Sequence, residues 1–180
     1  MNDRMPVAHR VLVAYGSKNG STAEIAQAVA ETLNEEGVTA TARPAALVGD
    51  LDGYDAVVIG GALYTGRWHR EARRFLRRHR SALSRLPVWL FSSGPLDASA
   101  TARDIPAVRG VLRTAAHLGA RGHVTFGGRL EQGAEGRVAH MILKSGKGGD
   151  FRDFPQIAAW ARNIARELEQ GEPPCAPRGS

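Results

Sequence analysis

Short apolar runs of strand length alternate along this 180-residue chain with longer stretches of helical period. Five runs have the length and the β-branched or aromatic content of strands: Arg10–Tyr15, Val38–Ala42, Ala56–Ile59, Val88–Phe91 and His123–Phe126. The helical stretches are Ser21–Glu36, Trp68–Leu83, Asp104–Leu118 and Phe154–Leu168. Because several strands are apolar throughout, they fit a parallel sheet that is buried on both faces. The sequence therefore predicts one α/β three-layer sandwich with a five-stranded parallel sheet.

Length and composition set the boundaries of that sandwich. A chain of 180 residues suits one domain, and 43% apolar with 23% charged residues excludes a disordered protein. The lone Cys175 excludes a disulfide framework, and no apolar run approaches the length of a spanning helix. We expect an N-terminal extension over 1–9, a domain over 10–171 and a tail over 172–180. A cytoplasmic protein is expected, with peripheral contact to the inner face of a membrane left open.

The positive charge is concentrated in one segment. Between Arg67 and Arg85 the chain holds eight arginines and one acid, Glu71, whereas the formal charge of the whole chain is +6. The rest of the molecule is therefore close to neutral. A patch of this kind predicts an anionic partner, a membrane surface or an acidic substrate.

The turn between the first predicted strand and the first predicted helix is rich in hydroxyl, amide and glycine residues. It holds Ser17, Lys18, Asn19, Gly20, Ser21 and Thr22. The free N–H groups and the positive dipole end of a helix N-terminus suit a phosphate, to which the hydroxyls add donors. Ser21 and Glu24 also fit a capping box, in which the turn only begins the helix. Both interpretations stay open on the residues alone.

The S-x-x-G-x-T arrangement of Ser17, Gly20 and Thr22 resembles the FMN phosphate loop of the flavodoxin family. The resemblance covers roughly residues 10–170. It implies a flavodoxin-like fold with strand order 2-1-3-4-5, and FMN outside the carboxyl ends of the central strands.

Under this resemblance, two further loops contact the flavin ring. After the third strand the candidates are Ala62, Leu63, Tyr64, Thr65 and Gly66, with Tyr64 as the preferred stacking residue. Trp68 is an alternative stacking residue, or else the first buried residue of the next helix. After the fourth strand the candidates are Ser92, Ser93, Gly94 and Leu96, although Gly94–Pro95 also fits a simple turn.

The runs GGALYTGRWH (60–69) and GGDFRDFPQIAAWARNIA (148–165) are similar to the menaquinone-dependent protoporphyrinogen oxidase branch of the family. The branch implies an FMN enzyme that passes electrons from a porphyrinogen to a membrane quinone. An insertion over 129–150 follows the fifth strand and places Val138, Met141 and Ile142 at helical spacing. It fits a substrate cover, a shallow membrane contact or a short helix on the sheet edge.

We assign no catalytic acid, base or nucleophile and no metal site, because a flavin supplies its own redox centre. Arg67, in the predicted ring loop, is expected to favour the anionic reduced flavin. Three functions stay open: an FMN oxidoreductase with an anionic substrate or a quinone, an electron carrier that docks on an acidic redox protein, and a flavin-free binding module. Nucleic-acid binding is not expected, since no aromatic residue is interleaved among the outward arginines.

Overall fold

A parallel sheet crosses the centre of the molecule, in a computed structural model that describes residues 8–17, 20–64, 66–94, 109–130, 149–150 and 152–171. Its strands follow the order β2-β1-β3-β5-β6. Their bounds are β1 Arg10–Gly16, β2 Thr39–Pro44, β3 Ala56–Tyr64, β5 Val88–Ser93 and β6 Gly122–Phe126. The short strand β4 (Arg67–Trp68) pairs antiparallel with β3 and is not part of this parallel order. When the five parallel strands are counted without β4, their order is 2-1-3-4-5, as expected.

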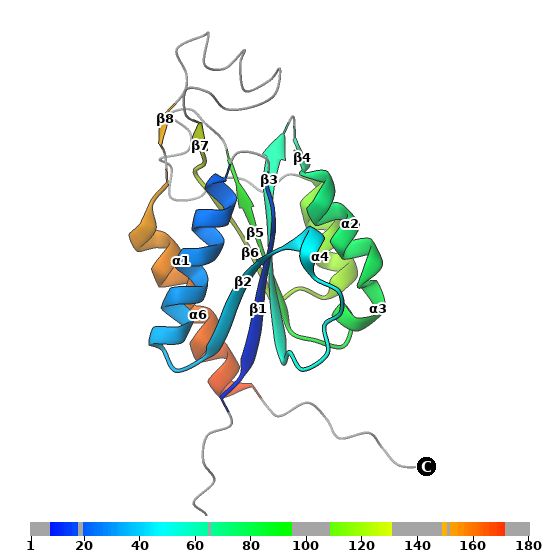
Figure 1. Cartoon of the computed structure of the whole chain (residues 1–180), viewed down its shortest axis with the longest axis vertical. Helices are drawn as coiled ribbons and strands as arrows, with labels where there is room; N and C mark the ends of the chain where they lie inside the picture. The colour runs from blue at the N-terminus through cyan, green and yellow to red at the C-terminus, as the bar shows by residue number, and fades with distance from the viewer. Residues whose placement is uncertain are drawn as a thin grey trace, which may run out of the picture.

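Helices cover both faces of the sheet, as Figure 1 shows. One face carries α1 (Ser21–Glu35) and α6 (Phe154–Gln170), and the other carries η1 (Ala45–Leu47), α2 (Arg70–Arg78), α3 (Arg80–Leu83) and α4 (Arg109–Leu118). The predicted three-layer α/β sandwich is therefore confirmed.

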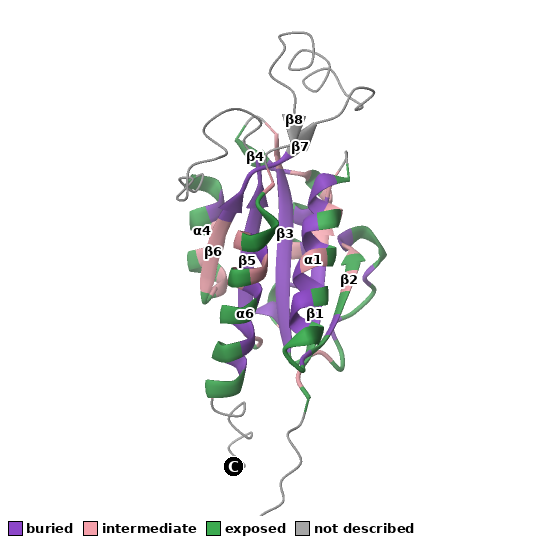
Figure 2. Cartoon of the chain, turned by 90° about the vertical axis from the view of Figure 1, so that its left-hand side faces the viewer, coloured by how far each residue is buried: buried purple, intermediate pink, exposed green. Residues whose placement is uncertain are grey.

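The apolar residues of each central strand divide between these two layers. Val11 and Val13 of β1 pack in the α1–α6 cluster, whereas Leu12 and Ala14 pack in the α2–α4 cluster. Since successive strand residues point to opposite faces, a strand with helices on both sides must be apolar throughout. Figure 2 shows the resulting continuous burial along the central strands.

The third strand is longer than predicted. It continues through Gly60 and Gly61 to Tyr64 and turns back as a hairpin, in which Leu63 pairs with Trp68 and Tyr64 with Arg67. The expected loop over 60–69 is therefore mostly strand. The reason is packing: the space of a Gly61 side chain is filled by the Trp68 indole, which lies 2.5 Å from an ideal Cβ.

Two predicted helices also differ from the structure. The helix expected over Trp68–Leu83 begins at Arg70 and divides at His79 into α2 and α3. In α4, Val111 is the one buried residue of the helix, and Leu112 is 49% exposed. The expected start of this helix, 104–108, lies outside the described residues.

The insertion over 129–150 begins and ends in a small antiparallel sheet of β7 (Arg129–Leu130) and β8 (Gly149–Asp150). The helical spacing predicted around Val138 falls outside the described residues, as do the expected extension before residue 8 and the tail after Gly171. In the described part of the chain, no helix has both the length and the apolar content needed to cross a membrane.

Candidate functional site

The central strands β1, β3 and β5 end at one edge of the sheet, where α1 begins. The Oγ of Ser17 and the Oγ1 of Thr22 are both buried there, and Thr22 as a whole has no exposed surface. Neither oxygen has a hydrogen-bond partner among the residues that the structure describes. A buried hydroxyl without a partner costs about 1–3 kcal/mol, so two of them at one helix start indicate a site for a ligand that accepts hydrogen bonds.

The start of α1 leaves room for such a ligand. Gly20 is the N-cap residue with φ +80°, a left-handed conformation that side chains other than glycine rarely adopt, and nothing lies within 4 Å of its ideal Cβ. The predicted capping box is absent, because the Glu24 amide donates to the Gly20 carbonyl and the Ser21 hydroxyl turns to Ser93. The side chain of Glu24 forms an ion pair with Arg152 instead.

This geometry fits a phosphate group. The first N–H groups of a helix, a glycine that permits close approach and two hydroxyl donors without a partner among the described residues are features that bind phosphate at such positions. Lys18 and Asn19, also candidates, lie outside the described residues. Ser21 joins the start of α1 to the end of β5, since its Oγ lies 3.3 Å from the Oγ of Ser93.

The β3–β4 hairpin forms the next wall of the site. Tyr64 is half-buried and packs edge-on against His69, with 5.9 Å between ring centroids. A hollow of about 660 Å³, a size typical of ligand pockets, adjoins the hairpin. It is lined by Ser17, Tyr64, Arg67, Trp68, His69, Arg70, Glu71 and Arg73. The structure thus places the phosphate-loop candidate Ser17 and the stacking candidate Tyr64 on one concavity.

The other hairpin candidates have different surroundings. Ala62 is buried, and its carbonyl accepts a hydrogen bond from the His69 amide. Leu63 is half-buried, and its Cβ lies 3.5 Å from the ideal Cβ position of Gly94, so the ends of β3 and β5 meet. Gly66 is exposed with φ +75°, as the hairpin turn requires, and Thr65 lies outside the described residues.

Trp68 is buried to 5% exposure and does not begin the helix, since it sits in β4, two residues before α2. Its Nε1 donates a 2.8 Å hydrogen bond to the Oγ of Ser92. The ring is therefore fixed inside the protein and is not free to stack on a ligand, which leaves Tyr64 as the aromatic candidate.

Ser92 and Ser93 point to opposite faces of β5. The Oγ of Ser92 also lies 3.0 Å from the Nε2 of His123, and burial lowers the pKa of His123 below its usual value. When His123 is neutral and its Nε2 carries no proton, Nε2 can accept a hydrogen bond from the Ser92 hydroxyl. The Ser92 hydroxyl then accepts from Trp68 and donates to His123, so its hydrogen bonds are made within the protein. Gly94 donates its N–H to the carbonyl of Phe126. Of the remaining candidates after β5, Leu96 lies outside the described residues.

His123 was not among the predicted site residues. The sequence contains six isolated histidines without paired spacing, and nothing near His123 in the sequence indicates Ser92, 31 residues away. Only the pairing of β5 with β6, with Leu90 opposite His123, brings the two together.

These features define a class of protein. Residues 12–141 match the family model described as the flavodoxin domain, and this is well over half of the chain. The chain therefore belongs to the flavodoxin domain family.

The named relatives share only part of their sequence with this chain. Protoporphyrinogen IX dehydrogenase (quinone) of Escherichia coli strain K12 is 28% identical over 85 residues, or 46% of this chain and 47% of that protein. The matches in the O6:H1 and O157:H7 strains have the same identity and extent. The chain thus spans about half the length of the curated relatives that it matches.

Solved structures share the fold at low identity. A flavodoxin from the domain Archaea has a TM-score of 0.61 at 12% identity, covering 89% of this chain and 99% of that one. Oxidised flavodoxin 1 from Bacillus cereus has a TM-score of 0.60 at 15% identity, covering 88% and 99%. Rubredoxin oxygen:oxidoreductase from Desulfovibrio gigas has a TM-score of 0.62 at 15% identity, covering 89% of this chain and 36% of that one.

Proposed function

We propose that this protein binds FMN at the carboxyl edge of its sheet and passes electrons through the flavin to a quinone. The observation that carries the proposal is the pair of buried hydroxyls, Ser17 Oγ and Thr22 Oγ1, without partners in the described chain at the start of α1. A phosphate monoester supplies the acceptor oxygens that both need.

The chain's own residues have defined parts in this proposal. Ser17, Gly20 and Thr22 hold the phosphate, with Lys18 and Asn19 in the same turn. Tyr64 supplies an aromatic face beside the hollow, while Leu63 and Gly94 form the adjoining strand ends. The hydroxyl of Ser93 joins the phosphate turn to β5 through Ser21. When bound, FMN supplies the redox chemistry, so no side chain is required as an acid or nucleophile.

One observation favours a quinone acceptor, and a second favours an anionic electron donor. The matched relatives carry the name protoporphyrinogen IX dehydrogenase (quinone), so a porphyrinogen is the donor to test first. The hollow also has Arg67, Arg70 and Arg73 in its wall. Cationic side chains there suit an anionic donor and favour the reduced, negatively charged flavin.

The second candidate is an electron carrier that docks on an acidic redox protein. It is favoured by the likeness to flavodoxin structures over nearly their full length. Such a protein would exchange single electrons with a partner and would not turn over a quinone.

Spectroscopy and rapid mixing separate these functions. We expect the purified protein to show flavin absorbance at about 450 nm, or to gain it with added FMN, and its reduced form to be reoxidised stoichiometrically by a soluble naphthoquinone. A protein that stays colourless with excess FMN contradicts flavin binding. Reduced protein that ignores the quinone but reduces a one-electron acceptor protein supports the carrier and overturns the quinone proposal.

A further inference from the structure

The outward side of α2 and α3 carries arginines that pair with no carboxylate among the residues that the structure describes. Ala72 and Phe75 turn toward the sheet and are fully buried, which leaves the opposite side of the helix to charged residues. We call the arginine face the set Arg70, Arg73, Arg74, Arg77, Arg80 and, from α4, Arg113. In the described part of the chain, no ion pair joins any of these six arginines to a carboxylate.

The spacing of these arginines along α2 brings like charges next to one another, so they repel each other. Arg70 and Arg74, and likewise Arg73 and Arg77, are four residues apart, so each pair adjoins on the helix surface and like charges there destabilise the helix. The helix is therefore stabilised by its buried side, not by its surface charges. A negatively charged partner removes the repulsion when it binds.

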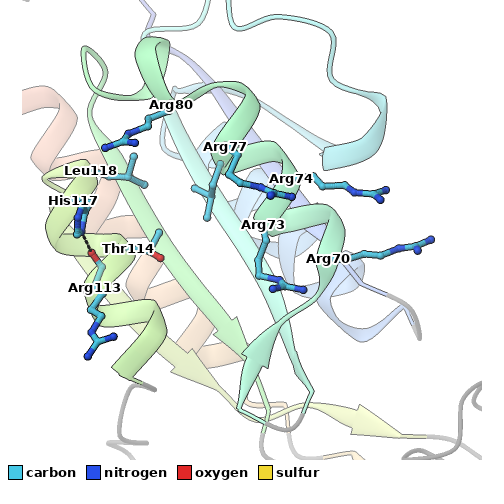
Figure 3. Close-up of a pocket in the computed structure, with 10 residues that line it drawn as sticks. Arg70, Arg73, Arg74, Arg77, Arg80, Arg113, Thr114, His117 and Leu118 are labelled. Carbon is cyan, nitrogen blue, oxygen red and sulfur yellow. Dashed lines mark hydrogen bonds between the residues drawn. The ribbon is translucent and has the colours of Figure 1, made fainter.

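The arginine face includes a groove between two helices. A hollow of about 660 Å³ has arginines of α2 and α3 on one wall and Arg113, Thr114 and His117 of α4 on the other (Figure 3). Leu76 and Leu118 also line it, and both are only half-exposed. Arginine stems add further apolar surface, because the charged group stands at the end of a three-carbon chain. The groove thus combines guanidinium groups with an apolar lining.

We propose that the arginine face docks this protein on a membrane surface rich in anionic phospholipid. The basic side chains that line the groove are arginines, apart from His117, and the planar guanidinium of arginine binds phosphate through two hydrogen bonds. The apolar lining distinguishes a lipid from a free phosphate ion, because a headgroup brings hydrocarbon with it. A single-stranded nucleic acid is typically held by aromatic rings that stack on its bases, whereas the neighbouring Trp68 and Phe75 are buried.

The arginine face lies next to the candidate flavin site. Arg70 and Arg73 line both the groove and the hollow beside Ser17 and Tyr64, so the two concavities are neighbours. A molecule docked by this face has its candidate flavin site at the bilayer, where lipid-soluble quinones are found. This consequence rests on the proposed function, but the docking itself does not.

Vesicle cosedimentation tests the docking without any redox step. We expect the protein to bind vesicles of equal parts phosphatidylglycerol and phosphatidylcholine at low salt and not vesicles of phosphatidylcholine alone. Since each basic residue near an anionic surface contributes a factor of about five, R73Q/R77Q should bind about 30-fold more weakly. The control R162Q/R166Q removes two charges at the same spacing from α6, on the opposite face, and should change binding by less than about threefold.

Circular dichroism spectra of both double variants serve as the control for folding and should match the spectrum of the wild type. Equal loss in the two double variants, or no preference for phosphatidylglycerol, overturns the proposal. Full competition by glycerol 3-phosphate assigns the face to free phosphates, and tighter binding of duplex DNA assigns it to nucleic acid; either result overturns it as well. If the protein does not bind the vesicles but its reduced form is still reoxidised by the quinone, only the docking inference is wrong. If it binds the vesicles but is not reoxidised by the quinone, only the proposed function is wrong.

Discussion

At the scale of single residues, Gly61 makes room for an aromatic side chain of the protein itself. Its missing Cβ leaves the space into which Trp68 packs, and the buried indole then donates to Ser92. Gly60 plays the same part for Phe91, whose ring lies 2.0 Å from the ideal Cβ position. These two glycines therefore serve internal packing, and their presence in a glycine-rich run is not by itself a sign of a ligand.

We predict that Gly61→Ala destabilises the protein by about 1–3 kcal/mol, because a rigid indole held by a hydrogen bond cannot yield to the added methyl group. Urea unfolding followed by fluorescence measures the change. Gly49→Ala is the matched control, since nothing lies within 4 Å of its ideal Cβ, and it should stay within about 0.5 kcal/mol of the wild type. Equal stability of the two variants would show that Trp68 does not fill this space.

His123 and His79 are predicted to make stability depend on pH. Burial lowers the pKa of each histidine below the usual 6.5, so below that value the unfolded chain takes up protons that the folded chain does not. The free energy of unfolding should therefore be constant above about pH 7.5 and fall as the pH drops through about 6.5. Urea midpoints across this range measure it. The variant H79Q/H123Q should lose less stability than the wild type, and an unchanged slope contradicts the assignment.

At the scale of elements, the β3–β4 hairpin carries Arg67 to the rim of the candidate site. We predict that Arg67→Ala lowers the midpoint potential of the bound flavin, since the guanidinium favours the anionic reduced form. Solvent screens an exposed charge, so the shift should be at most some tens of millivolts. Redox titration of both proteins measures the shift, with Arg166→Ala on α6 as the control. Identical midpoints would show that Arg67 does not tune the flavin.

The elements also show what the sequence was able to predict. The helix Ser21–Glu35, the edge strand β2 and the buried strands follow from local periodicity, and each was expected within a few residues. The end of β3, the division at His79 and the Ser92–His123 contact depend on side chains far apart in the sequence. Local patterns contain no information on such packing. That the hydroxyls of Ser17 and Thr22 have no partner among the described residues likewise became visible only when their surroundings were known.

At the scale of the whole molecule, the two faces of the sheet are proposed to have different functions. The α1 side contains the phosphate turn, and Arg152, which follows β8, pairs there with Glu24 and lies over the ring of Phe154. The α2–α4 side carries the arginine face. The candidate hollow has residues of both sides in its wall, Ser17 from the first and Arg73 from the second, so the proposed ligand site and the proposed docking face adjoin at one edge.

The most direct test of the central claim compares the dissociation constants of FMN and riboflavin, which differ by the phosphate alone. If Ser17 and Thr22 hold the phosphate, the wild type binds FMN far more tightly. In that case Thr22→Val weakens FMN by about 10-fold or more while leaving riboflavin unchanged. Thr32→Val, buried in the same helix ten residues on, is the control and should change neither. Equal affinity of the wild type for both flavins would contradict the account.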